Sequence, residues 1–252
     1  MSFRSTVVAL GLALAAGPAL AAATPGFITA AVGDAGRPAA DKRQDANRKP
    51  AELIAFTQIR PGQKVAELLP GGGYFTRIFS KTVGPEGKVY VIGPPGATVT
   101  VEGVLGDPAY ANVSAVTTFP AGLNLPEPVD VVWTSLNYHD LKNPPRGGGA
   151  PVDVAAFNKA VYDALKPGGY YVVIDHSAQP GDATASSTKH RIDQLTVVNE
   201  VAGAGFIKQA ELQALRRPAD PRTAPVFSLN GQSDQFVMVF RKPDLSLGGA
   251  IR

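Results

Sequence analysis

Cysteine is absent from the 252 residues of this chain, and its absence excludes several kinds of chemistry. The protein has no disulfide, no thiol nucleophile, no thiolate metal site and no iron–sulfur cluster. Charged residues make up only 18% of the chain, whereas hydrophobic residues make up 44%. This balance is typical of a folded domain with a substantial core and excludes a disordered protein.

Clusters of basic residues are also missing. The formal net charge is +3 and the sequence pI is about 9.1, but no run of five Lys or Arg residues occurs. A nucleic-acid-binding protein gathers such residues on one face or segment. We therefore predict a mildly basic, solvated surface and no nucleic-acid partner. The expected partner is a small-molecule substrate, and the sequence leaves the oligomeric state open.

A hydrophobic run long enough to span a membrane is lacking as well. The strongly apolar stretch near the start of the chain, Val7–Ala16, follows a single basic residue, Arg4. Small-x-small cleavage sites come next, at Ala19–Ala21 and Ala21–Ala23. This pattern is typical of a signal peptide over residues 1–23, and the apolar part is shorter than the ~20 residues of a spanning helix. We expect export to the periplasm or the medium, with no membrane anchor after cleavage.

Past this segment, the sequence divides into a linker, one domain and a tail. Residues 24–42 are small and polar with scattered Gly and Pro, which predicts a flexible linker. Residues 43–245 form the predicted α/β domain, and residues 246–252 form a C-terminal tail.

Short apolar segments alternate with amphipathic ones through the domain. The apolar, β-branched segments predict seven strands, at Lys64–Leu69, Lys88–Ile92, Val113–Thr118, Val129–Ser135, Tyr170–Asp175, Phe206–Leu215 and Gln235–Arg241. The amphipathic segments predict helices at Ala51–Arg60, Tyr74–Val83, Val154–Leu165 and Ser187–Ala204, with room for a weak one in Pro94–Ala111. This alternation predicts a mostly parallel sheet with helices on both faces.

The most informative motif is the turn that follows the first predicted strand. Segment Val65–Tyr74 places Glu67 on the strand and Gly71, Gly72 and Gly73 in the loop. Glycines let a backbone approach a ligand closely, and the start of the next helix offers free N–H groups. No Gly-Lys-Ser/Thr follows, which excludes a P-loop. Because a carboxylate here would repel phosphate, the loop suits a ligand that carries an ammonium or sulfonium group.

These residues resemble a known family. Val65–Gly73 looks like motif I of the class I S-adenosylmethionine-dependent methyltransferases, and Leu165–Gly169 is similar to another recurrent segment of that fold. A bacterial group of exported, predicted methyltransferases resembles this chain at Pro70–Arg77, Asn137–Asp140, His190–Asp193 and Phe240–Pro243. The resemblance implies a Rossmann-like, seven-stranded sheet with a reversed final strand. It also implies S-adenosylmethionine as the cofactor and methyl transfer to an acceptor that the sequence does not identify.

A cofactor site follows from the same resemblance. Its predicted residues are Glu67, Leu69, Gly71, Gly72, Gly73, Tyr74, Gly93 and Asn137. Leu69 stands where the family has the first glycine of the loop, and Gly93 stands where the family has an acid that holds the ribose hydroxyls. Each charge-assisted hydrogen bond lost with that acid is worth about 1.5–3 kcal/mol. As an alternative to ligand binding, Glu67 could cap N–H groups of the loop.

Histidine is scarce, and two of the three histidines, His139 and His176, follow predicted strands. Methyl transfer to oxygen or nitrogen often requires removal of a proton, and a histidine beside a carboxylate is suited to that role. His139 with Asp140 is therefore the predicted base, and Tyr138 is predicted to orient the substrate or to line the adenine site. Alternatively, the His139–Asp140 pair only caps a loop. His176 fits a structural position, and His190 fits the rim of the site or the surface.

Two other functions stay open at this point. A non-catalytic binding protein of the same fold is favoured by Leu69, by Gly93 and by export away from an evident cofactor supply. A metal-dependent enzyme could draw on Asp140 and the three histidines. No local ligand spacing such as His-x-x-x-His is present, so the sequence assigns no metal.

Overall fold

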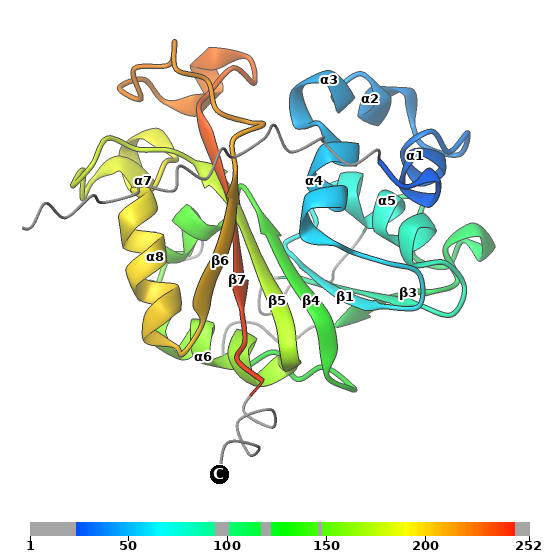
Figure 1. Ribbon diagram of the computed structural model, residues 1–252. Helices are drawn as coiled ribbons and strands as arrows, with labels where there is room; N and C mark the ends of the chain where they lie inside the picture. The colour runs from blue at the N-terminus through cyan, green and yellow to red at the C-terminus, as the bar shows by residue number, and fades with distance from the viewer. Residues whose placement is uncertain (1–23, 94–100, 117–121, 146–147, 245–252) are drawn as a thin grey trace, which may run out of the picture.

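The computed structural model describes residues 24–93, 101–116, 122–145 and 148–244 (Figure 1). The predicted signal peptide, the tail at 246–252 and the first part of the Pro94–Ala111 segment lie outside the described residues. Within the described part of that segment, a 3-10 turn, η1, covers Pro108–Tyr110.

A single seven-stranded sheet organises the described chain. Its strands are β1 (Lys64–Leu68), β2 (Lys88–Ile92), β3 (Val113–Val116), β4 (Val129–Ser135), β5 (Leu165–His176), β6 (Ile207–Leu212) and β7 (Gln235–Arg241). They lie in the order β3-β2-β1-β4-β5-β7-β6. Strands β1 to β5 pair in parallel, and β7 is antiparallel to both of its neighbours. The predicted mostly parallel sheet with a reversed final strand is confirmed.

Helices cover both faces of the sheet (Figure 1). The described helices are α1 (Gly26–Val32), α2 (Ala39–Lys42), α3 (Asp45–Arg48), α4 (Pro50–Thr57), α5 (Tyr74–Val83), α6 (Val154–Ala164), α7 (Ala185–Lys189) and α8 (Gln194–Gly203). On one face, Phe75 and Phe79 of α5 pack on Trp133 of β4, with ring centroids 5.0 Å apart in each pair. On the other face, α6 and α8 bury Phe157, Val197 and their neighbours. The core therefore forms two apolar layers separated by the sheet.

The N-terminal segment differs from the sequence prediction. Residues 24–42 were expected to form a flexible linker, but α1 packs against α4 and α5, with Ile28 and Ala31 buried. Arg37, which is 3% exposed, forms an ion pair with Asp45, and Asp45 also accepts a hydrogen bond from the Tyr74 hydroxyl. The linker prediction is wrong because the packing of α1 and the Arg37–Asp45 ion pair hold a segment whose own apolar pattern is weak.

The predicted helix Ser187–Ala204 is two helices, α7 and α8. The break falls at His190, whose φ is 53°, and at Arg191, which is completely buried. Leu195 is 61% exposed, while Val197 and Val201 are buried.

The order of the strands predicts where a ligand-binding crevice lies on the sheet. Strands β2 and β3 extend to one side of β1, whereas β4 and the later strands extend to the other side. In such sheets, ligands bind beyond the carboxyl ends of the strands where the strand order reverses. This point lies here between β1 and β4.

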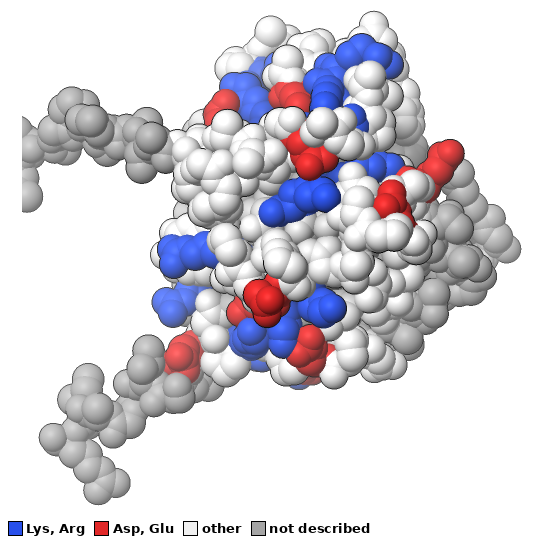
Figure 2. All heavy atoms as spheres, turned by 90° about the vertical axis from the view of Figure 1, so that its right-hand side faces the viewer, with Lys and Arg blue, Asp and Glu red and all other residues white. Residues whose placement is uncertain are grey.

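No helix of the described residues is long and apolar enough to cross a membrane. On the face shown in Figure 2, Lys and Arg side chains are interspersed with Asp and Glu side chains.

Candidate active site

A cavity of about 280 Å³ lies at the crevice between the carboxyl ends of β1 and β4. Six of the predicted cofactor-binding residues line it, namely Glu67, Leu69, Gly71, Gly72, Tyr74 and Asn137. Asn137 spans the crevice, because its side-chain amide donates to the carbonyls of Leu69 (3.2 Å) and Ser135 (2.8 Å). The sequence prediction thus brought together residues that do share a pocket.

Glu67 is the buried acid of this cavity, with an exposed fraction of 4%. Burial raises the pKa of its carboxyl to about 8, although the hydrogen bond from Thr76 and the charges of Arg48 and Arg77 oppose the rise. Among the described residues, the hydroxyl of Thr76 donates to Glu67, and no loop N–H does. A carboxyl in such surroundings ionises readily only when a cation comes close.

The loop glycines have different roles. A Cβ at Gly71 or Gly72 would meet no atom within 4 Å, so the backbone there faces open space beside the cavity. Gly73 is instead required for packing, since a Cβ would lie 2.1 Å from Val101 and its φ is 82°. Gly73 and Gly93, at the end of β2, do not belong to the described lining of the cavity. Their assignment to the cofactor stays a prediction.

Two leucines at the strand ends adopt the left-handed backbone conformation that favours glycine. Leu69 follows β1 with φ 51°, and Leu136 follows β4 with φ 62°. This conformation costs a residue with a Cβ roughly 1–2 kcal/mol, and such strain gathers at functional sites. Leu69, which stands where the resemblance places a glycine, thus has a backbone conformation that glycine favours, and both leucines line the cavity.

Sequence reasoning missed Arg48, which enters the cavity from the end of α3. Its guanidinium lies over the Tyr74 ring, 4.5 Å from the centroid, and no described side chain accepts a hydrogen bond from it. Burial lowers its pKa, partly offset by the charges of Tyr74, Asp41 and Glu67. No sequence pattern indicates a role for Arg48, because it lies just before the predicted helix Ala51–Arg60, far along the chain from Glu67. Only the folded structure brings Arg48 close to the end of β1.

Arg48 and Glu67 together make the cavity complementary to a zwitterion. The buried acid suits an ammonium or sulfonium group, and the guanidinium suits a carboxylate. The amino-acid end of S-adenosylmethionine carries these charges, and the backbone at Gly71 and Gly72 leaves room for a ligand. The residues present therefore fit this cofactor.

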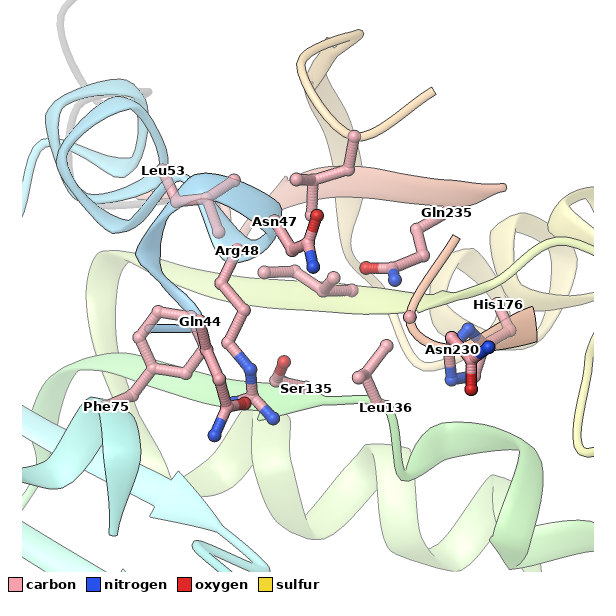
Figure 3. Close-up of a pocket in the computed structure, with 13 residues that line it drawn as sticks. Gln44, Asn47, Arg48, Leu53, Phe75, Ser135, Leu136, His176, Asn230 and Gln235 are labelled. Carbon is pink, nitrogen blue, oxygen red and sulfur yellow. The ribbon is translucent and has the colours of Figure 1, made fainter. Parts of the chain in front are cut away.

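A second cavity of about 270 Å³ adjoins the first and shares Gln44, Arg48, Phe75, Ser135 and Leu136 with it. Figure 3 shows Arg48 and Gln44 at one end of this cavity and His176 and Asn230 at the other, with Leu136 between them. Its polar groups are mostly uncharged amides, from Gln44, Asn47, Asn230 and Gln235. We call this second cavity the acceptor cavity below.

His176, expected to be structural, lines the acceptor cavity. Ser233 Oγ lies 2.7 Å from its Nδ1 atom. Burial lowers the pKa of His176 to about 4, so the ring is neutral at pH 7. A neutral imidazole can hydrogen-bond a bound molecule without adding charge to the cavity.

The predicted catalytic residues lie next to this region but outside the described lining of both cavities. Tyr138 is 1% exposed. Its hydroxyl donates a hydrogen bond to Glu200 and accepts one from the side-chain amide of Asn158. His139 is 3% exposed, and its Nδ1 lies 2.8 Å from Asp175 Oδ1. Burial lowers the pKa of His139, but the charges of Asp175 and Asp140 outweigh it, so the net shift is upward. Catalysis by Tyr138, His139 and Asp140 stays a prediction.

The sheet order, the glycine loop and the crevice define the fold of the class I S-adenosylmethionine-dependent methyltransferases, and comparison with solved structures agrees. A methyltransferase of this type from Aquifex aeolicus covers 82% of this chain and 98% of its own, with a TM-score of 0.54 and 17% identity. One from Mesorhizobium loti covers 77% and 97%, with a TM-score of 0.54 and 18% identity. The [4+2]-cyclase SpnF, at 14% identity and a TM-score of 0.53, covers 79% and 82%. The predicted fold is confirmed.

Among curated proteins, the chain is similar to the ubiquinone/menaquinone biosynthesis C-methyltransferase UbiE of Hydrogenovibrio crunogenus. The identity is 29% over 132 residues, which is 49% of this chain and 46% of that protein. The match thus spans about half the length of the curated relative. No protein-family model matches the chain.

Proposed function

We propose that this protein is an S-adenosylmethionine-dependent methyltransferase that acts on a small-molecule acceptor. One observation carries the proposal. A buried acid, Glu67, and a guanidinium that hydrogen-bonds to none of the described side chains, Arg48, line one cavity at the switch point of a methyltransferase fold. The cofactor supplies an activated methyl group on a sulfonium, and the names of the similar proteins support this cofactor.

The acceptor cavity is the proposed place for the second substrate. It adjoins the cofactor cavity at Arg48, Phe75 and Leu136, so an acceptor there would lie next to a cofactor bound in that cavity. Holding two reactants in contact supplies much of the barrier reduction in such transfers. The amide groups and the neutral His176 favour an uncharged, polar acceptor of small size.

Binding of S-adenosylhomocysteine tests the cofactor assignment. We expect isothermal titration of the purified protein to show one site, with Arg48→Ala weakening it at least tenfold, because a charge-assisted hydrogen bond to the ligand carboxylate is lost. Arg43→Ala is the matched control, since Arg43 is exposed on the same segment and lines neither cavity. Absence of both heat and a thermal shift at millimolar ligand would contradict the proposal.

Binding alone does not establish methyl transfer, because the same fold serves a cyclase. Transfer of a labelled methyl group into the small-molecule fraction of a cell extract would establish it. Arg48→Ala should lose this transfer, and Arg43→Ala should retain it. Label found only in macromolecules would refute the small-molecule acceptor while leaving the cofactor assignment intact.

We also propose that the mature protein acts outside the cytoplasm, on the basis of the signal-peptide pattern in residues 1–23. Fractionation of cells that express the chain should place it in the periplasm or the medium. N-terminal sequencing of that material should begin at Ala22 or Thr24. A full-length chain found in the cytoplasm would rule out this localisation.

A further inference from the structure

The side chains of His139, Asp140 and His190 converge although no ligand motif joins them in the sequence. His139 and Asp140 lie in the 3-10 turn η2 (Tyr138–Lys142), and His190 follows α7. His139 Nε2 is 3.3 Å from His190 Nδ1 and 3.4 Å from Asp140 Oδ1, and the third pair of atoms is 3.8 Å apart. Three potential metal ligands therefore face one point in space.

These distances are those of a small coordination sphere. In a tetrahedral site with metal–ligand bonds of about 2.0–2.2 Å, ligand atoms lie about 3.3–3.6 Å apart. Two of the three separations fall in this range, and the third exceeds it slightly. Two imidazoles and one carboxylate are a donor set that zinc and iron(II) accept, usually with a coordination position left for water or a ligand.

A buried carboxylate orients the central histidine. Asp175, which is completely buried, lies 2.8 Å from His139 Nδ1 and accepts the backbone N–H groups of His139 and His176. An acceptor at Nδ1 keeps the proton on that nitrogen and leaves the lone pair of Nε2 free to face His190. Carboxylates placed behind metal-binding histidines act in this way and strengthen the site.

The other two ligands are accessible to an ion. The side chain of His190 is 36% exposed and that of Asp140 is 46% exposed. The ring of Phe227 meets the His190 ring edge-on, with centroids 4.7 Å apart, and so limits the ring's rotation. His190 also holds a left-handed backbone conformation, with φ 53°. Strain of this kind is typical of functional positions.

We propose that His139, Asp140 and His190 bind one divalent zinc ion, with Asp175 as the positioning carboxylate. This site is separate from the proposed cofactor cavity and does not depend on it. The third histidine, His176, is not a ligand, because its Nδ1 contacts Ser233 and its ring faces the acceptor cavity. Its ring centroid is 6.1 Å from that of His139, so the ion would lie one side chain behind the acceptor cavity.

Zinc titration of the tag-free protein after chelator treatment tests this site. We expect one equivalent of zinc per chain, a rise in melting temperature of several degrees, and a tetrahedral absorption spectrum when cobalt(II) replaces zinc. His190→Ala should weaken binding at least 100-fold and remove the thermal shift, since the side chain is partly exposed and can be truncated without disturbing the core.

Two further variants make the outcome specific. Asp175→Asn should weaken zinc binding about 10–100-fold, as expected for a group that acts through His139. Asp163→Asn, an exposed carboxylate on α6, should bind zinc like the wild type. Equal zinc affinity in the wild type and His190→Ala, or a cobalt(II) spectrum without tetrahedral bands, would overturn the proposal.

Discussion

Replacing Glu67 with glutamine is expected to remove the pH dependence of S-adenosylmethionine binding. With a pKa of about 8, the buried carboxyl of the free protein is mostly protonated at pH 6 and about half ionised at pH 8. A cationic group of the ligand binds the ionised form, so wild-type affinity should rise about tenfold or more across this window. Glu67→Gln should bind weakly and equally at both values. Titration calorimetry at pH 6, 7 and 8 measures this.

Proton release gives the same experiment a second readout. When a cation binds beside Glu67 near pH 7, the carboxyl should lose its proton, and the heat of binding should then depend on the ionisation enthalpy of the buffer. Glu67→Gln should show no such dependence. Glu52→Gln, an exposed acid on α4, is the matched control and should behave like the wild type. A wild-type affinity that stays flat from pH 6 to 8 would show that Glu67 does not face a cation.

Glu67→Gln should be more stable than the wild type, although it should bind S-adenosylmethionine more weakly. Because the folded-state pKa is raised above 4.5, the protonated carboxyl stabilises the fold below pH 4.5, and this stabilisation is lost as the pH rises through about 8. The glutamine amide of the variant does not ionise, so the variant loses no stability from this position between pH 4.5 and 8. At pH 8 we therefore expect the free energy of unfolding of Glu67→Gln to exceed that of the wild type by on the order of 3 kcal/mol. Urea unfolding of the ligand-free proteins tests this.

The sheet was predictable because each strand carries its own signal. The β-branched segments at Lys88–Ile92 and Gln235–Arg241 are almost wholly apolar, and both are strands with the predicted bounds. The same holds for α6, which forms over the predicted amphipathic segment and buries Phe157 and Val161. The local sequence pattern and the burial in the fold agree at these positions, and such segments can therefore be predicted from sequence.

The N-terminal helices were not predictable in this way. Residues 24–42 contain few large apolar side chains, and their order depends on contacts such as Arg77 with Asp41 and Arg37 with Asp45. A sequence pattern carries no information on a partner 36 residues away. The same limit concealed Arg48. Its charge is evident in the sequence, but only the fold brings it to Glu67 and Tyr74.

The candidate site was predictable only in part. The glycine loop and Asn137 were found because they adjoin strand ends, and strand ends meet at one edge of a parallel sheet. The histidines were placed at that edge too, but their roles depend on side-chain direction. His176 points to the acceptor cavity, whereas His139 turns toward Asp175 and His190.

Replacing Arg191 with methionine is expected to cost about 3–5 kcal/mol of stability, the loss typical when one member of a buried ion pair is removed. Arg191 is completely buried, donates to the carbonyls of Ser177 and Ala224, and lies 2.9 Å from Asp220. Methionine has a similar length but would leave Asp220 buried without its counter-charge. Urea unfolding at pH 7 should show the loss, whereas Lys159→Met, in an exposed pair with Asp163, should change little.

A double variant separates the ion pair from packing. If the loss comes from the unpaired charge, Arg191→Met with Asp220→Leu should be more stable than Arg191→Met alone, because no buried charge is left. The backbone N–H groups of Asp234 and Arg222, which donate to Asp220, would still lose their acceptor, so recovery should be partial. Additive losses in the double variant would assign the effect to packing. Because Asp234 donates to Asp220 and precedes Gln235 of the acceptor cavity, the double variant should also disturb that cavity, whereas Glu67 and Arg48 should still bind S-adenosylhomocysteine in the fraction that remains folded.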